Sequence, residues 1–481
     1  MAQEVSAGKA SSAAQSVLLP LALAQFICSF AGSNMNVMIN DISKDLDTTV
    51  EGVQLAITIF LLVMAALMIP GGKLTDKYGR KKCFMVGLVL YAIGALLSAV
   101  SPGLGVLILG NSIFEGVGTA LLIPPVYILA TMLFSGVTSR ARAFGAISAA
   151  GGVGAAAGPL IGGLITTAIS WRAAFVFQAL IIAVIVWLSR KLEDPVPADP
   201  TRRFDGWGAV LSATGLILLV SGIMAADNNV WVMLGLMVVG ALILTWFFFL
   251  MRAEERKGVE PLLSLGLFRN RTSNLGLVTQ NAQWLTLMGV SFTVAAYLQV
   301  VRGYNAIQTG VIYTAATVGV LASSMAAARL AKRYAQRTLI IAGFVLTLVG
   351  IVLFLVMVHG SPKTWVFVPG LFLIGLGVGA MLTPSVNIVQ SSFGEDQQGE
   401  ISGLSRSVSN LGSSFGTAIA GTILVSDLTS GNTSYVLAMV FLAVLALVGL
   451  GAAIRLPTGG QDRARGELVP AHGLETATEH G

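Results

Sequence analysis

The chain has 481 residues, of which 55% are hydrophobic and only 11% are charged, and it contains 55 glycines. This composition lies well outside that of a soluble domain, so an ordinary soluble enzyme is excluded. The net charge of +6 would suggest a nucleic-acid surface if the basic residues clustered, but they are divided among short segments between apolar runs. No spacing of cysteine, histidine or carboxylate residues fits a metal site, and no nucleophile elbow or phosphate loop is present. We therefore expect no enzyme activity, no cofactor and no nucleic-acid partner.

Apolar runs long enough to cross a bilayer follow one another along the chain. We place fourteen of them, at 17–40, 52–72, 83–100, 105–130, 143–168, 172–190, 207–226, 230–250, 273–300, 308–329, 338–358, 364–390, 402–426 and 433–454. With a cytoplasmic N-terminus, all but four of the 29 lysine and arginine residues fall on the inner side, the exceptions being Lys44, Arg172, Arg302 and Lys363. This bias follows the positive-inside rule and predicts an all-α polytopic membrane protein with both termini in the cytoplasm.

The first run carries a stripe of polar side chains. Gln25, Ser29, Ser33, Asn36 and Asn40 recur at intervals of three or four residues, which places them on one face of a helix. Polar groups at membrane depth face a cavity or a partner helix rather than lipid. We favour a cavity lining, with interhelical hydrogen bonding as the alternative.

The second run ends in a glycine-containing, strongly basic segment. Residues 72–82 read GKLTDKYGRKK and fit G-x-L-x-D-[RK]-x-G-[RK]-[RK] at every specified position. Gly72 and Gly79 allow a turn tight enough to join two antiparallel spans, and the cations hold the segment in the cytoplasm. Asp76 is expected to anchor a charge network that forms in one conformational state and breaks in another. The alternative is a plain solvated basic loop.

Glu115 is the only carboxylate near the middle of any predicted span. An ionised carboxylate at that depth is costly unless it is paired or protonated, so Glu115 is a candidate proton site. A neutral carboxylic acid hydrogen-bonded within the helix bundle is the alternative. Asp41, in the acidic segment after the first run, is a second candidate for proton coupling.

The fifth run is unusually rich in glycine, and residues 144–163 read FGAISAAGGVGAAAGPLIGG. The spacing G-x8-G-x3-G-P-x2-G-G removes side chains from one helical face, so that another backbone can approach closely, as helix association in lipid requires. The proline leaves a carbonyl group that neighbouring helices must satisfy. The positions of this pattern are Gly145, Gly154, Gly158, Pro159, Gly162 and Gly163. A tight crossing of small residues, without further function, is the alternative.

Segments 72–82 and 144–163 resemble two motifs of the major facilitator superfamily: the signature loop between helices 2 and 3, and the antiporter motif of helix 5. The resemblance extends over residues 17–455 and implies the major facilitator fold, with two six-helix bundles and two inserted transmembrane helices. It also implies a gating role for Asp76 and Arg80. In pattern the chain is similar to the fourteen-span drug:proton antiporters of the bacterial cytoplasmic membrane.

Three positions depart from the pattern of these antiporters. Ala31 stands where their first helix has a membrane aspartate, although Asn36 of the same motif is retained. Ser112 stands where drug antiporters have an arginine, and Glu115 replaces their usual glutamine. These departures leave the route of proton coupling open.

An internal repeat indicates two homologous halves. Adding 258 to four residue numbers of the fifth run converts Gly145, Gly154, Gly158 and Gly163 into Gly403, Gly412, Gly416 and Gly421. The two spans that lie between polar linkers outside this repeat look inserted. The predicted organisation is a cytoplasmic tail at 1–16, an N-terminal six-helix bundle at 17–190, linkers with two extra transmembrane helices at 191–271, a C-terminal six-helix bundle at 272–455 and a disordered cytoplasmic tail at 456–481.

In the family, the first and fourth helices of each half line a central cavity. The residues that this resemblance assigns to the cavity are Gln25, Ser29, Asn36, Gln280, Gln283, Trp284 and Asn387. Trp284 is expected to stack on a flat or cationic substrate, with packing inside the bundle as the alternative.

The sequence thus predicts a secondary active transporter that exports small amphipathic or cationic compounds in exchange for protons, by alternating access. A symporter, or an exporter of a lipid, pigment or endogenous metabolite, has the same fold and is the nearest alternative. A membrane receptor or a membrane enzyme is a more distant one. We expect a monomer in contact with the lipid bilayer.

Overall fold

The computed structural model describes residues 2–134, 137–194, 198–201, 203–225, 229–330, 333–360, 363–394, 397–425 and 432–457. Most of these residues are helical, as predicted, and none of them forms a strand. The predicted tail at 456–481 lies outside this part of the chain apart from its first two residues. Helix α1 (Ala2–Asn34) includes residues 2–16 of the predicted tail, and its apolar span begins at Val17. The alanines of residues 2–16 favour the helix.

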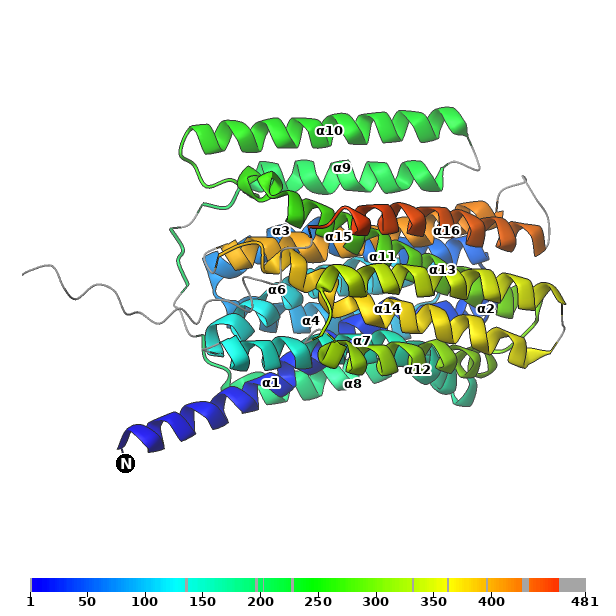
Figure 1. Ribbon diagram of the computed structural model, residues 1–481, viewed down its shortest axis with the longest axis horizontal. Helices are drawn as coiled ribbons and strands as arrows, with labels where there is room; N and C mark the ends of the chain where they lie inside the picture. Colours follow the sequence, from blue (N-terminus) through cyan, green and yellow to red (C-terminus); the bar gives the residue numbers. More distant parts are fainter. Residues whose placement is uncertain are drawn as a thin grey trace, which may run out of the picture.

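The long helices lie side by side along one common direction (Figure 1). The first part of the chain forms α1, η1 (Met35–Val37), α2 (Ile39–Asp45), α3 (Val50–Tyr78), α4 (Arg80–Ala99), α5 (Leu104–Leu107), η2 (Ile108–Glu115), α6 (Gly116–Leu133), α7 (Val137–Ala168) and α8 (Trp171–Leu188). The second part forms α9 (Gly206–Met224), α10 (Val230–Arg256), α11 (Arg271–Ala296), η5 (Tyr297–Val301), α12 (Ala306–Leu330), α13 (Gln336–Gly360), α14 (Phe367–Gln390), α15 (Gln398–Val425) and α16 (Asn432–Ile454).

Twelve helices of the described chain are long and apolar enough to cross a membrane. The number rises to thirteen if the two arms of α7, 145–155 and 157–168, which meet at 42°, form one span. Pro159 explains the bend, because a proline ring clashes with the carbonyl four residues earlier, here that of Ala155. The remaining predicted span corresponds to α15, whose sequence is rich in serine, glycine and threonine and is therefore less apolar than the others.

Two glycine-rich helices, α7 and α15, make close backbone contacts. A Cβ atom on Gly154 would lie 3.0 Å from the carbonyl carbon of Phe26 in α1, and closer still to its oxygen. A Cβ atom on Gly412 would lie 3.1 Å from the carbonyl carbon of Asn281 in α11. α7 also packs along α12, and α15 packs along α3. Gly154 and Gly412, which the sequence repeat relates, therefore make equivalent contacts in the two parts of the chain.

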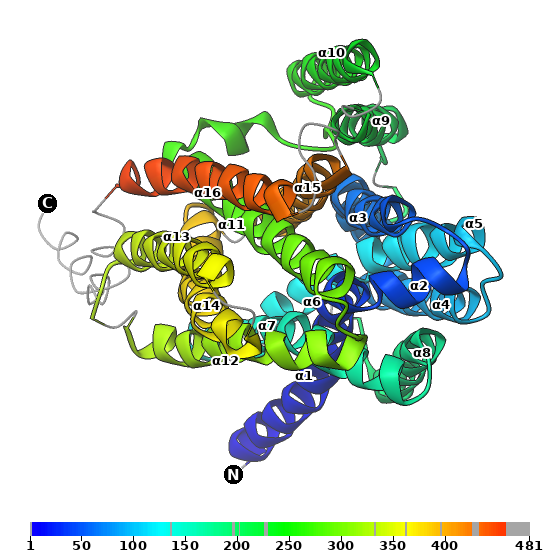
Figure 2. The ribbon, with the colours of Figure 1, turned by 90° about the vertical axis from the view of Figure 1, so that its right-hand side faces the viewer.

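Helices α9 and α10 lie at one side of the molecule, with α10 on the outside (Figure 2). α9 rests on α3 and α15, and Leu62, Val220 and Ala418 form a small buried cluster between these helices. α10 packs mainly on α9. Only Gly240, Phe247 and Met251 are buried among the residues of α10, all of which are described.

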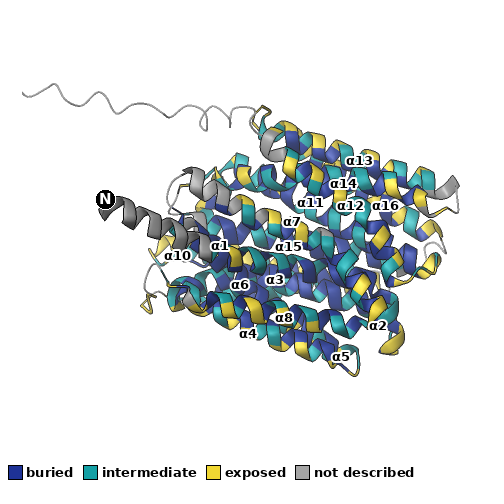
Figure 3. Cartoon of the chain, turned by 90° about the horizontal axis from the view of Figure 1, so that it is seen from below, coloured by how far each residue is buried: buried dark blue, intermediate teal, exposed yellow. Residues whose placement is uncertain are grey.

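Apolar side chains are exposed in stripes along outward-facing helix surfaces. On α4 the stripe contains Val86, Val89, Ile93 and Leu96, and exposed residues also follow the outer face of α8 (Figure 3). A soluble protein rarely exposes such a surface, whereas lipid tails cover it without cost. The fold is therefore that of a multi-pass membrane protein.

Candidate functional site

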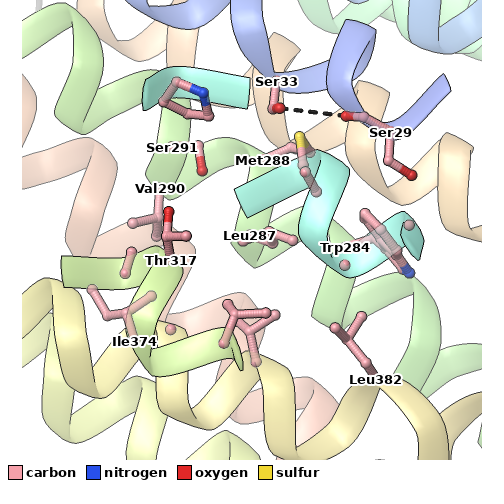
Figure 4. A pocket seen from close by; sticks show the side chains of 18 of the residues that line it. Ser29, Ser33, Trp284, Leu287, Met288, Val290, Ser291, Thr317, Ile374 and Leu382 are labelled. Carbon is pink, nitrogen blue, oxygen red and sulfur yellow. Dashed lines mark hydrogen bonds between the residues drawn. The ribbon is translucent and has the colours of Figure 1, made fainter. Parts of the chain in front are cut away.

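A cavity of about 1020 Å³, including its open mouth, lies between α1, α7, α11, α12, α14 and α15. We call it the main cavity. Trp284, Leu287 and Met288 of α11 lie across from Leu382 of α14, and aliphatic and small residues form most of the remaining wall (Figure 4). Polar side chains are the minority of the wall and include Ser29 and Ser33 of α1. Walls of this kind suit an apolar ligand that carries few polar groups.

A second cavity of about 530 Å³ adjoins the main cavity, between α1, α3, α11 and α15. We call it the side cavity. The residues that line both are Gln25, Ser29, Ala155, Trp284, Met288 and Arg406. Because α1 and α7 come from the first part of the chain and α11 and α15 from the second, a ligand in either cavity would contact both parts.

A chain of hydrogen bonds ties three helices together where the cavities meet. The Arg406 guanidinium of α15 donates to the Tyr127 hydroxyl of α6 and lies over the Tyr127 ring, 4.6 Å from its centroid. Tyr127 in turn donates to Gln25 Oε1 at 3.1 Å, and Gln25 Nε2 donates to Ser29 Oγ at 3.1 Å. The chain therefore connects α15, α6 and α1 at the cavity wall.

Of the predicted cavity residues, Gln25, Ser29 and Trp284 lie on the cavity walls. Asn387 is exposed near the end of α14 and lines neither cavity. The main cavity also takes lining residues from α7, α12 and α15. Among the described residues of α6, only Ile123 lines a cavity, and it lines the side cavity. The fourth helix of the first part thus contributes less than the resemblance implied.

Gln280 and Gln283 are buried, accept hydrogen bonds from neighbouring helices and line neither the main cavity nor the side cavity. The Ser405 hydroxyl of α15 donates to Gln280 Oε1 at 2.9 Å, and the Ser385 hydroxyl of α14 donates to Gln283 Oε1 at 2.8 Å. Both glutamines therefore hold α11 to its neighbours.

Asn36 lies beyond the last turn of α1, in a cluster that joins the two parts of the chain. Gln299 of η5 donates from Nε2 to the Asn36 carbonyl oxygen at 2.7 Å, and the Asn40 amide donates to Gln299 Oε1 at 3.1 Å. α12 begins shortly after η5 in the sequence. The Ile307 amide of α12 donates to Thr167 Oγ1 at 3.0 Å, which joins α12 to α7. These contacts hold the helices together at the end of the molecule where α1 stops.

The basic segment 72–82 is not an extended loop. α3 continues to Tyr78 and α4 begins at Arg80, so Gly79 alone makes the turn, with φ +95° and ψ 144°. This backbone conformation favours glycine, as predicted for that position. Gly72 instead lies inside α3, where its Cβ would meet Pro124 of α6 at 3.8 Å. The helix continues past Gly72 because no proline or further glycine interrupts residues 73–78.

Asp76 and Arg80 form an ion pair across this turn, with Asp76 Oδ1 3.0 Å from Arg80 Nη2. Lys73, three residues before Asp76, makes the contact that reaches a distant helix. Its Nζ lies 2.7 Å from Glu400 Oε1 of α15 and 2.9 Å from Glu260 Oε1. An ion pair between Lys73 and Glu400 therefore links α3 to α15.

Glu115 ends the π-helical segment η2 and is fully buried. It faces α4, where the Cβ of a residue at Gly94 would lie 2.8 Å from Glu115 Cγ. The side chains of Tyr91 and Ser98 face the carboxyl group, yet neither carboxyl oxygen makes a hydrogen bond of good geometry with a described residue. Glu115 lines neither cavity, so it does not touch a ligand bound there. π-helical turns such as those of η2 occur frequently at functional sites.

Asp41 lies in α2, outside the apolar spans. Burial raises the pKa of its carboxyl group above the ordinary value, although Lys44 on the same helix opposes the shift. The Asp41 carboxyl group therefore takes up a proton at a higher pH than an exposed aspartate does.

Four functional candidates were not found in the sequence analysis: Arg406, Tyr127, Lys73 and Glu400. In the sequence, Arg406 was interpreted only as one of the inner-side cations. A lone arginine within an apolar run could have identified it as a candidate binding residue. Lys73 occupies an unspecified position of the basic motif, and its partner Glu400 lies 327 residues away. Pairing over such a separation is visible only in the fold.

The sequence profile of the Major Facilitator Superfamily matches residues 21–269 and 276–472. Puromycin resistance protein pur8 of Streptomyces alboniger is 28% identical over 412 residues, which cover 84% of this chain and 81% of the relative. The probable actinorhodin transporter of Streptomyces coelicolor is 30% identical over 417 residues, covering 84% and 71%. Multidrug efflux pump LfrA of Mycolicibacterium smegmatis is 26% identical over 379 residues, covering 77% and 73%.

Solved structures show the same overall fold. The crystal structure of peptide transporter POT in complex with sulfate matches with a TM-score of 0.66 and 17% sequence identity, and the match covers 92% of this chain and 94% of that one. At this level of identity the likeness concerns the path of the chain alone.

Proposed function

Because this chain belongs to the major facilitator superfamily, we propose that it is a secondary transporter that exports small amphipathic compounds. The main cavity carries the proposal, since its apolar walls, the Trp284 ring and a few hydroxyl groups suit a ligand that is mostly apolar. Relatives named as a puromycin resistance protein and a multidrug efflux pump point to the same class of cargo.

The proposed architecture has fourteen spans in two six-helix halves, 17–190 and 272–455, with α9 and α10 inserted through the linkers of 191–271. The equivalent packing of α7 on α1 and α12, and of α15 on α11 and α3, supports the two halves and the inclusion of α15 as a span. The distribution of basic residues supports a bacterial cytoplasmic membrane protein with both termini in the cytoplasm. A monomer remains part of the proposal.

Alternating access is supported by two sets of contacts near opposite ends of the helices. Gln299 with Asn36 joins the two parts of the chain at one end, and Lys73 with Glu400 joins them at the other. A transporter that breaks one set while it keeps the other opens its cavity to one side at a time. Asp76 and Arg80, at the turn below Lys73, would gate this movement.

Glu115 is the proposed site of proton coupling, and it would act on the cavity from a distance. The residue directly precedes α6, and the same helix carries Tyr127, which holds Arg406 at the cavity wall. Protonation that shifts η2 would therefore move a cavity residue without contact between proton and substrate. Glu115→Gln should bind substrate normally but lose transport driven by a pH gradient. If gradient-driven transport survives in this variant, coupling lies elsewhere, with Asp41 as the next candidate.

The exporter function is tested by uptake of fluorescent amphipathic dyes of anionic, neutral and cationic type into everted membrane vesicles. Vesicles that contain the protein should accumulate at least one of these dyes when a proton gradient is imposed, and an uncoupler should abolish the accumulation. Vesicles without the protein are the control. Equal accumulation in the two preparations, for every amphipathic compound tried, would contradict the proposal.

An exporter of an endogenous metabolite is the second candidate. The relatives include the probable actinorhodin transporter and riboflavin transporter RibZ of Clostridioides difficile, the latter 27% identical over 431 residues. Both names denote aromatic compounds with polar substituents, which the main cavity could also hold. Competition of such metabolites with dye uptake distinguishes the two candidates.

A further inference from the structure

The charge of the cavity walls is carried by one residue. Among the described residues that line the main and side cavities, Arg406 is the only ionised side chain, and no lining residue is a carboxylate. A guanidinium group keeps its charge at all physiological pH values. Both cavities therefore present a fixed positive charge at the point where they meet.

Arg406 is held in place without a carboxylate partner from the described chain. Its guanidinium lies over the Tyr127 ring and donates to the Tyr127 hydroxyl, and that hydroxyl is itself fixed by Gln25. The nearby Ser409, Asn410 and Ser413 of α15 are neutral and also line the side cavity. A cation that the protein orients but does not neutralise attracts an anion from solution, all the more strongly inside apolar walls.

We infer that the cavity selects amphipathic compounds that carry an acidic group, with Arg406 as the residue that binds the anion. The inference deepens the proposed exporter function and rests on it. A carboxylate or phenolate fits the planar fork of a guanidinium, and the apolar body of the compound would lie against Trp284 and Met288 in the main cavity. A cationic compound of the same shape would meet repulsion from Arg406. The inference keeps the amphipathic cargo expected from the sequence but replaces the cationic class with an anionic one.

Three compounds that share one fluorophore test the charge selectivity: dansyl-leucine, its neutral methyl ester, and the amine dansylcadaverine. Equilibrium dialysis against protein in lipid nanodiscs, with empty nanodiscs as the blank, measures the affinity for each at neutral pH. The wild-type protein should bind the carboxylate about tenfold more tightly than the ester, and the amine most weakly. Equal affinities, or a preference for the amine, would overturn the inference.

Variants then assign the selectivity to one side chain. Arg406→Gln should bring carboxylate affinity down to that of the ester while ester affinity stays unchanged, and Arg406→Lys should keep most of the preference. Arg271→Gln is the matched control, because it removes the same charge from an exposed position at the start of α11. Retention of the full preference in Arg406→Gln would overturn the role of Arg406. The ranking in the wild-type protein still decides the charge class if that variant does not fold.

A transport assay distinguishes failure of this inference from failure of the exporter function. The same compounds are offered to everted vesicles with a proton gradient. Gradient-driven uptake together with equal binding of all three would leave the exporter intact and refute the anionic class. The binding order carboxylate, ester, amine without uptake of any compound would uphold the anion site and refute export.

Discussion

Alanine in place of Gly154 is expected to push α7 away from α1. The new Cβ would lie 3.0 Å from the Phe26 carbonyl carbon and closer to its oxygen, whereas ordinary contacts begin near 3.4 Å. The obstacle is backbone, which cannot rotate aside, so the helices must separate locally. Overpacking of this kind costs about 1–3 kcal/mol. Alanine gains roughly 0.5–1 kcal/mol over glycine in a helix, which offsets part of the loss.

Gly145→Ala is the matched control, since it makes the same substitution in the same helix and the same motif. Gly145 is exposed, and a Cβ there would have no neighbour within 4 Å. Both variants gain the same helix propensity, so the difference between them isolates the cost of the clash, about 1–3 kcal/mol. Unfolding by dodecyl sulfate titration measures that difference, and vesicle uptake should fall for Gly154→Ala alone. Equal unfolding midpoints and equal uptake would refute the close-contact role of Gly154.

Three further predictions concern the remaining sites. Asp76→Asn should remove the ion pair with Arg80 and nearly abolish uptake with normal membrane insertion, so undiminished uptake would exclude a gating role. Trp284→Ala should weaken dye binding by roughly 2- to 30-fold, which corresponds to about 0.5–2 kcal/mol of ring contact, and an unchanged affinity would favour a packing role. Because burial raises the pKa of Asp41, its ionised form destabilises the folded protein above that pKa, and the penalty disappears as the pH falls below it. Asp41→Asn should therefore raise the unfolding temperature at neutral pH but not in acid. An increase in unfolding temperature that is independent of pH would contradict the raised pKa of Asp41.

The all-helical fold could be predicted from the sequence because each level of evidence pointed to the same family. Apolar runs marked where long helices lie, and the repeat of glycines at an offset of 258 related Gly154 to Gly412. The structure places both of these glycines against the backbone of a neighbouring helix. The spacing of small residues carries this information because only a missing side chain permits such an approach.

The exact use of each motif position could not be predicted. Gly145 and Gly154 look equivalent in the pattern, but only Gly154 faces another helix. Gly72 and Gly79 both suggested a turn, yet only Gly79 adopts a positive φ. A motif specifies residue types and their spacing. Which neighbour each residue contacts depends on how its helix is rotated against helices from elsewhere in the chain.

The composition of the cavity wall was the least accessible part of the site. A polar residue in a span can face a cavity or a partner helix, and the sequence does not distinguish the two, as Gln25 and Gln283 illustrate. Arg406 looked like one more inner-side cation because it lies near the start of its run. Its place beside Tyr127 arises from the packing of α15 near α6, two helices that are distant in sequence.

The small number of buried residues in α10 has a consequence for the membrane around this protein. Val230–Met251, the apolar part of that helix, spans about 33 Å at 1.5 Å per residue, close to the ~30 Å thickness of a hydrocarbon core. α10 packs mainly on α9, and few other protein contacts hold it. A thinner bilayer is therefore expected to tilt α10 together with α9 before it disturbs the helices around the cavity.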